Sequence, residues 1–147
     1  MPSQTFFNLP QMKRQNITNA AIAEFVNHSY ESASISAIVN RAKIAKGSFY
    51  QYFKDKQDLY LYLVDRALEA RNAFIAEANL PSVESGFFVF LQALFQTILE
   101  FQLANPRWSQ ILFRGPQPSS SFLLQPSSFS LIPNTHHKLT SYDKYYF

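Results

Sequence analysis

The chain contains no cysteine and only three glycines among its 147 residues. The lack of cysteine excludes disulfides and thiolate-ligated metal sites and favours a reducing compartment, so we expect a cytoplasmic protein. Residues 1–10 have neither a basic start nor a long apolar run, and we expect no signal peptide. No carboxylate pair, nucleophile–base set or phosphate-binding loop is apparent, so we expect neither an enzyme nor a cofactor. The adjacent His136 and His137 lie in a polar segment and do not indicate a metal site.

Helix-breaking residues are few through most of the chain. Between residues 11 and 114 the glycines and prolines are Gly47, Pro81, Gly86 and Pro106. Between these breakers, apolar residues recur every three or four positions, the period of an amphipathic helix. The sequence therefore predicts an all-α protein, with helices at about 10–28, 34–42, 46–52, 55–79, 82–104 and 107–114.

Polar residues at the predicted helix starts support several of these boundaries. Asn8 is placed to cap the first helix, Ser34 the second and Asp55 the fourth. Asp58 then adds negative charge in the first turn of the fourth helix, where the helix dipole favours it. The fifth helix is apolar nearly all round, which is typical of a helix surrounded by others. Five polar residues interrupt it, so we expect a buried helix and no membrane span.

Positive charge is concentrated in the first third of the chain. Residues 1–56 contain seven basic and three acidic side chains, whereas residues 57–114 contain four basic and six acidic ones. A polyanionic partner is therefore expected at the N-terminal end.

Residues 34–53 are the most informative segment. They predict two short helices joined by a tight turn, and the second helix is too polar to be buried. Phe49 and Phe53 are expected to face the core. Tyr50 and Tyr52 cannot both face inward with them, so at least one is exposed. A small, basic and aromatic helix surface of this kind suits the major groove of DNA.

This segment and its flanks resemble the DNA-binding head of TetR-type transcriptional repressors. The residues that carry the resemblance are Ala20, Ala21, Phe25, Tyr30, Ile38, Ala42, Ile44, Lys46, Gly47, Ser48, Phe49, Tyr50, Tyr52, Phe53, Lys56 and Leu59. The resemblance implies a three-helix helix-turn-helix head followed by a helical domain that binds a small molecule and forms a homodimer. It implies a repressor that occupies a palindromic double-stranded DNA operator.

The resemblance also implies roles for individual side chains. The recognition helix is the one predicted at 46–52. Its start and the start of the preceding helix, at 34–42, would meet the duplex, and Lys56 would meet a backbone phosphate. Gln51 suits adenine, Lys46 suits guanine, and Gly47 lets the helix approach closely. The implied DNA-binding residues are Ser34, Ser36, Lys46, Gly47, Ser48, Tyr50, Gln51, Tyr52 and Lys56.

Three positions depart from the family pattern. Lys43 stands in the turn where the family usually has glycine, and a lysine there costs about 1 kcal/mol in a left-handed conformation. Ala45 replaces the usual serine cap, which removes about 1 kcal/mol of capping. Ser29 replaces a glycine after the first helix.

Three segments are expected: a helix-turn-helix domain at 8–54, a partial helical regulatory domain at 55–114 and an irregular tail at 115–147. The tail contains seven serines and four prolines without helical period. We therefore expect a truncated repressor, whose shift in composition near residue 114 fits a change of reading frame. Missing C-terminal helices would put the homodimer in doubt. A cavity for an apolar effector would be lined by Phe87, Phe90, Leu94, Phe95 and Ile98, although ordinary packing is the more common reason for any single one of them.

Two alternatives to an operator-binding repressor stay open. The first alternative is a fragment that binds no DNA and only packs with a full-length helical partner. The second is a purely structural helical module, which would tolerate Lys46→Glu and Tyr50→Ala.

Overall fold

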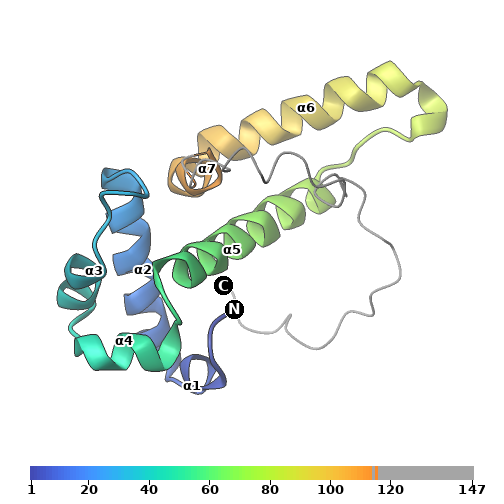
Figure 1. Cartoon of the computed structure of the whole chain (residues 1–147). Helices are drawn as coiled ribbons and strands as arrows, with labels where there is room; N and C mark the ends of the chain where they lie inside the picture. Colours follow the sequence, from blue (N-terminus) through green and yellow to red (C-terminus); the bar gives the residue numbers. More distant parts are fainter. Residues whose placement is uncertain (114, 116–147) are drawn as a thin grey trace, which may run out of the picture. The chain divides into compact units, whose positions relative to one another are not determined.

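A computed structural model describes residues 1–113 and 115, and within them every regular element is helical (Figure 1). The fold class expected from the sequence is confirmed. The irregular segment expected at 115–147, with His136 and His137, lies outside the described residues except for Gly115. The elements are α1 (Gln4–Phe7), α2 (Gln11–Asn27), α3 (Ile35–Ala42), α4 (Lys46–Tyr52), α5 (Lys56–Glu77), the short 3-10 helix η1 (Val83–Ser85), α6 (Phe87–Ala104) and α7 (Pro106–Phe113).

The head of the molecule is built by α2, α3 and α4, with the first turns of α5 closing its core. Each helix buries one apolar stripe, as the three- and four-residue spacing predicts. Ile17 of α2, Ile38 of α3 and Phe49 of α4 are fully buried together with Leu59 of α5. The boundaries of α4 agree with the sequence prediction, and Ser34 and Asp55 are N-caps as expected.

A short helix, α1, was missed by the sequence analysis. Its Phe6 is fully buried and lies 4.8 Å from Phe53 and 5.3 Å from Tyr62, ring centre to ring centre. Asn8 is the C-cap of α1. The prediction that Asn8 caps the start of the next helix is therefore wrong. Pro10 takes the N-cap position of α2 instead. Proline is tolerated at a helix start because an amide hydrogen there would have no partner within the helix. A four-residue helix is too short to show a period.

Two carboxylates join the helices of the head. The buried Glu24 of α2 accepts a hydrogen bond from the backbone amide of Ser34 at 3.0 Å and so fixes the start of α3. Asp58 accepts one from the amide of Lys54 at 3.0 Å, while its own amide donates to the Asp55 carboxylate at 2.8 Å. These bonds satisfy backbone donors that helix starts leave unpaired.

Beyond the head, α5 runs away from it and α6 returns alongside, which brings α7 back against α5 and α2 (Figure 1). The hydroxyl of the buried Tyr60 in α5 donates to the backbone oxygen of Ile111 in α7. Trp108 and Leu112 of α7 pack against the head core. The last described helix therefore stabilises the head directly.

The outward face of α6 is exposed, contrary to the expectation of a buried helix. Only Thr97 and Phe101 of its 18 residues are buried, whereas Phe88 and Leu103 are 82% and 83% exposed. Within the described residues α6 is also the one helix whose length and mean hydropathy of 1.5 meet the criterion for a membrane span. The sequence period was uninformative here because apolar residues occupy both faces of α6.

Candidate nucleic-acid interface

The short helix α4 presents a polar face to solvent on an aromatic base. Phe49 and Phe53 are buried at its inner side, with ring centres 5.6 Å apart. Tyr50 points outward and is 53% exposed, and its ring lies edge-on to that of Phe49 at 5.2 Å. Two phenylalanines thus hold the orientation of the helix, and packing against Phe49 holds the outward ring of Tyr50.

Tyr52 lies on the buried side of α4. Its side chain is 4% exposed and its ring centre is 6.2 Å from that of Phe6. The expectation that this ring faces a duplex is wrong, because the pocket that α1 provides for it was not visible in the sequence. Of the two tyrosines considered, Tyr50 is the exposed one.

The first turn of α4 has the open surface that a duplex contact needs. Lys46, Gly47 and Gln51 are exposed and Ser48 is half-buried. A methyl group placed on Gly47 would meet nothing within 4 Å, so the fold itself does not require glycine there. Ala45 is the N-cap and gives no side-chain cap, as its replacement of serine predicts.

The start of α3 lies in the same part of the head. The Ser34 hydroxyl accepts from the Ala37 amide at 3.5 Å, so this side chain is engaged in capping its own helix. Ser36 is exposed on the first turn. Ser34 and Ser36 are therefore both accessible to solvent, although the Ser34 hydroxyl already accepts the capping hydrogen bond of α3.

Lys56 has a different environment from the one expected. Its ammonium donates to the backbone oxygens of Tyr30 at 2.7 Å, Glu31 at 3.1 Å and Ala33 at 3.1 Å. An ammonium has three N–H donors, and all three are used. The expectation of a phosphate contact is therefore wrong for this structure, because the loop after α2 supplies carbonyls that the sequence did not reveal.

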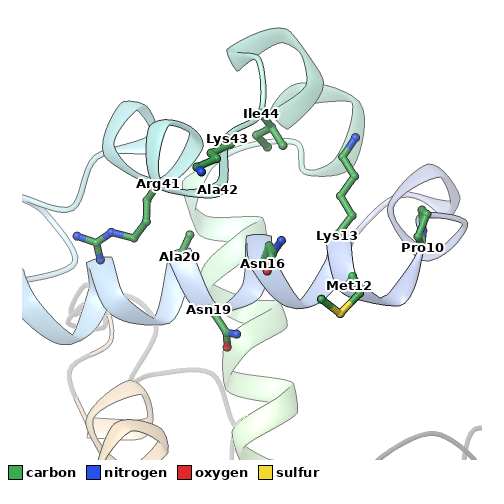
Figure 2. A pocket seen from close by; sticks show the side chains of 10 residues that line it. All are labelled: Pro10, Met12, Lys13, Asn16, Asn19, Ala20, Arg41, Ala42, Lys43 and Ile44. Carbon is green, nitrogen blue, oxygen red and sulfur yellow. The ribbon is translucent and has the colours of Figure 1, made fainter.

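The turn between α3 and α4 contains the left-handed residue that the sequence predicts. Lys43 has φ 53° and ψ 46° and is the C-cap of α3. It borders a groove of about 690 Å³ between α2 and the turn, which also contains Lys13 of α2 and Arg41 of α3 (Figure 2). The sequence did not indicate that these three cations lie together, because they come from separate elements.

Ionisation in the head follows from its hydrogen bonds. Burial disfavours the charged form of Asp58, but hydrogen bonds from the chain's amino group and the Lys54 amide outweigh it and lower the pKa of this carboxyl. Burial, with the nearby Asp55 and Glu31 carboxylates, raises the pKa of Tyr30. In residues 1–113 and 115 no group of three His, Cys, Asp or Glu side chains is placed to hold a metal ion.

The five residues expected to line an effector cavity differ in their exposure. Phe87 and Phe95 are 57% and 63% exposed, so the described part of the chain does not enclose them. Phe90, Leu94 and Ile98 are half-buried. Phe90, Leu94 and Ile98 remain a proposal for an apolar surface that holds an effector.

The comparisons with known proteins agree with this geometry. The sequence profile of the family described as "Bacterial regulatory proteins, tetR family" matches residues 17–63, which cover most of the head. The Transposon Tn10 TetC protein of Escherichia coli is 29% identical over 91 residues, which are 62% of this chain and 45% of TetC. An HTH-type transcriptional regulator of Staphylococcus aureus (strain bovine RF122 / ET3-1) is 36% identical over 93 residues, covering 63% and 49% of the two chains.

A solved structure extends the likeness to the fold. The crystal structure of a TetR family transcriptional regulator from Chloroflexus aurantiacus J-10-fl has a TM-score of 0.71 and 40% identity, and the match covers 84% of this chain and 58% of that one. This chain therefore spans about half the length of these two curated relatives and somewhat more of the solved structure.

Proposed function

Because this chain belongs to the TetR family of bacterial regulatory proteins, we propose that it is a transcription regulator that binds double-stranded DNA through α3 and α4. The second of these helices is proposed to enter the major groove. A regulator that acts on chromosomal DNA in this way works in the cytoplasm and needs no catalytic step.

The observation that carries the proposal is the charge and exposure of residues 32–54. This segment contains four basic residues and no acidic one, so nothing within it repels a polyanion. The exposed Lys46, Tyr50 and Gln51 project from a helix that Phe49 and Phe53 fix to the core. Rigid placement lowers the entropy cost of binding.

The chemistry of these side chains assigns a role to each. Lys46 suits the acceptors of guanine, and the Gln51 amide suits adenine through two hydrogen bonds. Tyr50 suits a backbone phosphate through its hydroxyl or a thymine methyl through its ring. Ser36 and Ser48 carry hydroxyls suited to phosphate oxygens, which fix the register of the protein on the duplex.

A regulator of this kind acts as a homodimer, and this is part of the proposal. Two heads bind two half-sites one helical turn apart, about 34 Å, which matches a palindromic operator. An apolar effector held against Phe90, Leu94 and Ile98 would change the spacing of the heads and so release the DNA.

The decisive experiment is selection of duplexes from a random pool by the full chain, followed by binding measurements over a salt series. We expect an enriched palindrome and an affinity that falls steeply with salt. Gln51→Ala should lose the preference for adenine at one position while non-specific affinity is kept, whereas Lys46→Glu should abolish retention. Arg107→Glu, an equal charge reversal on the exposed side of α7, is the matched control.

Two outcomes would favour the alternatives. A monomer in sizing chromatography with no salt-sensitive retention of DNA would favour a fragment that only packs with a helical partner. If Lys46→Glu and Arg107→Glu behaved alike on DNA, the head would be a structural module.

A further inference from the structure

The groove between α2 and the turn before α4 has a rim of three cations that come from three different elements. Lys13 lies in the first turns of α2, Arg41 in the last turn of α3 and Lys43 in the turn itself (Figure 2). All three side chains are exposed. The groove is therefore open to solvent and accessible to a large ligand.

No negative charge offsets these cations. The other polar residues that line the groove are the amides Asn16 and Asn19, and no acidic residue lines it. None of the three cations takes part in an ion pair within residues 1–113 and 115. Mutual repulsion between unpaired like charges is unfavourable in the free protein, and an anion relieves it.

Neighbouring basic residues show what a structural cation looks like in this head. Arg14, next to Lys13 in sequence, donates to the backbone oxygens of Phe7 and Leu9. Lys56 donates to three carbonyls. In the described part of the chain the cations around the groove have no such bonds, so their charge is available to a ligand.

Lys43 adds a second, independent observation. It is the one residue other than glycine with positive φ in the described part of the chain. Glycine adopts this conformation without strain, so a lysine here is less favourable for the fold than the residue that suits the turn. Strain of this kind is consistent with a role of the exposed side chain in binding.

We propose that the groove lies against the sugar–phosphate backbone of the bound duplex, with Lys13, Arg41 and Lys43 as donors to its phosphates. This inference rests on the proposed function and adds a contact outside the major groove. Lys43 is three residues before Lys46, so the groove adjoins the start of α4. A guanidinium and two ammonium groups are the donors that bind phosphate best in proteins.

The test measures binding of a labelled random-sequence duplex to the full chain, between about 50 and 200 mM salt. Lys13→Gln, Arg41→Gln and Lys43→Gly are compared with Arg107→Gln, which removes one charge from α7. Each groove variant should bind several-fold more weakly and reduce the slope of log affinity against log salt by about one. Arg107→Gln should leave the slope unchanged.

Lys43→Gly separates function from folding. It should raise the urea midpoint of unfolding, because the strained residue is gone, while DNA binding weakens. If the wild type binds duplex and the groove variants keep its slope, the groove holds no phosphate although the proposed function stands. If the wild type binds no duplex, both fail. Binding of pyrophosphate to the groove at matched ionic strength that leaves the affinity for the duplex unchanged would overturn the duplex assignment in favour of a small-anion site.

Discussion

The ammonium of Lys56 donates a hydrogen bond to the backbone oxygen of Tyr30 at 2.7 Å and lies 4.8 Å from the centre of the Tyr30 ring. Two further carbonyls, of Glu31 and Ala33, accept from the same group. The first residue of α5 thus fastens the connection between α2 and α3. The side chain combines charge-assisted hydrogen bonds with a cation–π contact.

Lys56→Met should therefore destabilise the head. Three backbone oxygens lose a charged donor, and because the group is partly exposed we expect a loss of about 2 kcal/mol in the free energy of unfolding. Urea denaturation followed by circular dichroism measures it. Lys54→Met, at an exposed neighbouring lysine, should change the free energy by less than about 0.5 kcal/mol. Equal effects of the two substitutions would contradict the structural role of Lys56.

The hydroxyl of Tyr60 predicts a specific alkaline transition. Burial, with a smaller effect of Tyr30, raises the pKa of Tyr60 to about 12, above the ordinary value of 10.0. A raised folded-state pKa means that the stabilisation is complete below pH 10 and is lost as the pH rises towards 12. Ionisation would also break the hydrogen bond to the Ile111 oxygen, so α7 should separate from α5 in this range.

Absorbance of tyrosinate during a pH titration checks this prediction. One tyrosine should ionise well after the exposed ones, and Tyr60→Phe should remove that late step. The prediction is wrong if all tyrosines ionise near their ordinary pKa while the protein is still folded.

The two tyrosines of α4 should respond to substitution in opposite ways. Tyr52→Ala leaves a cavity beside Phe6 and should cost about 3 kcal/mol of stability. Tyr50→Ala should cost less than about 1 kcal/mol, because the ring is half-exposed, but should weaken binding to DNA. Paired measurements of the urea midpoint and of duplex affinity separate the effects. Loss of DNA binding by Tyr52→Ala in a fully folded protein would contradict the assignment.

Ala45→Ser should stabilise the head. Ala45 is the N-cap of α4, with extended ψ of 145° and no side-chain cap. A serine hydroxyl there can accept from an unpaired amide in the first turn, which is worth about 1 kcal/mol. Thermal unfolding measures the gain, and Ala45→Val, which has no hydroxyl and caps no better than alanine, should give none. Unchanged stability in Ala45→Ser would show that the first turn already has its donors satisfied.

The exposed apolar side of α6 predicts self-association. Phe88 and Leu103 are its most exposed members, and continuous apolar surface is unfavourable in water. The double variant Phe88→Ser, Leu103→Gln should lower binding of a hydrophobic dye and shift sedimentation towards smaller species, with stability almost unchanged. Phe101→Ala, at a buried position of the same helix, should instead reduce stability. Identical sedimentation of the double variant and the wild type would contradict the prediction.

Local signals in the sequence located the helices of the head. Caps at Ser34 and Asp55, the strained turn at Lys43 and the bounds of α4 follow from rules that operate within a few residues. What was missed depends on contacts distant in sequence. The pocket for Tyr52 is formed by Phe6, which is 46 positions away, and no single-segment pattern reports such a contact.

The candidate site divides in the same way. Exposure of Lys46 and Tyr50 follows from the helical period once Phe49 and Phe53 are assigned to the core. The hydrogen bonds of the Lys56 ammonium do not follow from the helical period, because their acceptors are backbone oxygens, which every residue has. Apolar residues on both faces of α6 likewise gave no indication of which face would lack a partner.

The seven-residue length of α4 limits how much information one head can read. Its end is held by Ser3, whose amide donates to the Tyr52 oxygen at 2.8 Å and whose hydroxyl donates to the Gln51 oxygen at 2.6 Å. Seven residues span about 10 Å, or roughly three base-pair steps. A given sequence of three base pairs occurs by chance about once in every 64 positions. Recognition of a unique site in a genome therefore requires a second DNA-binding head at a fixed spacing from the first.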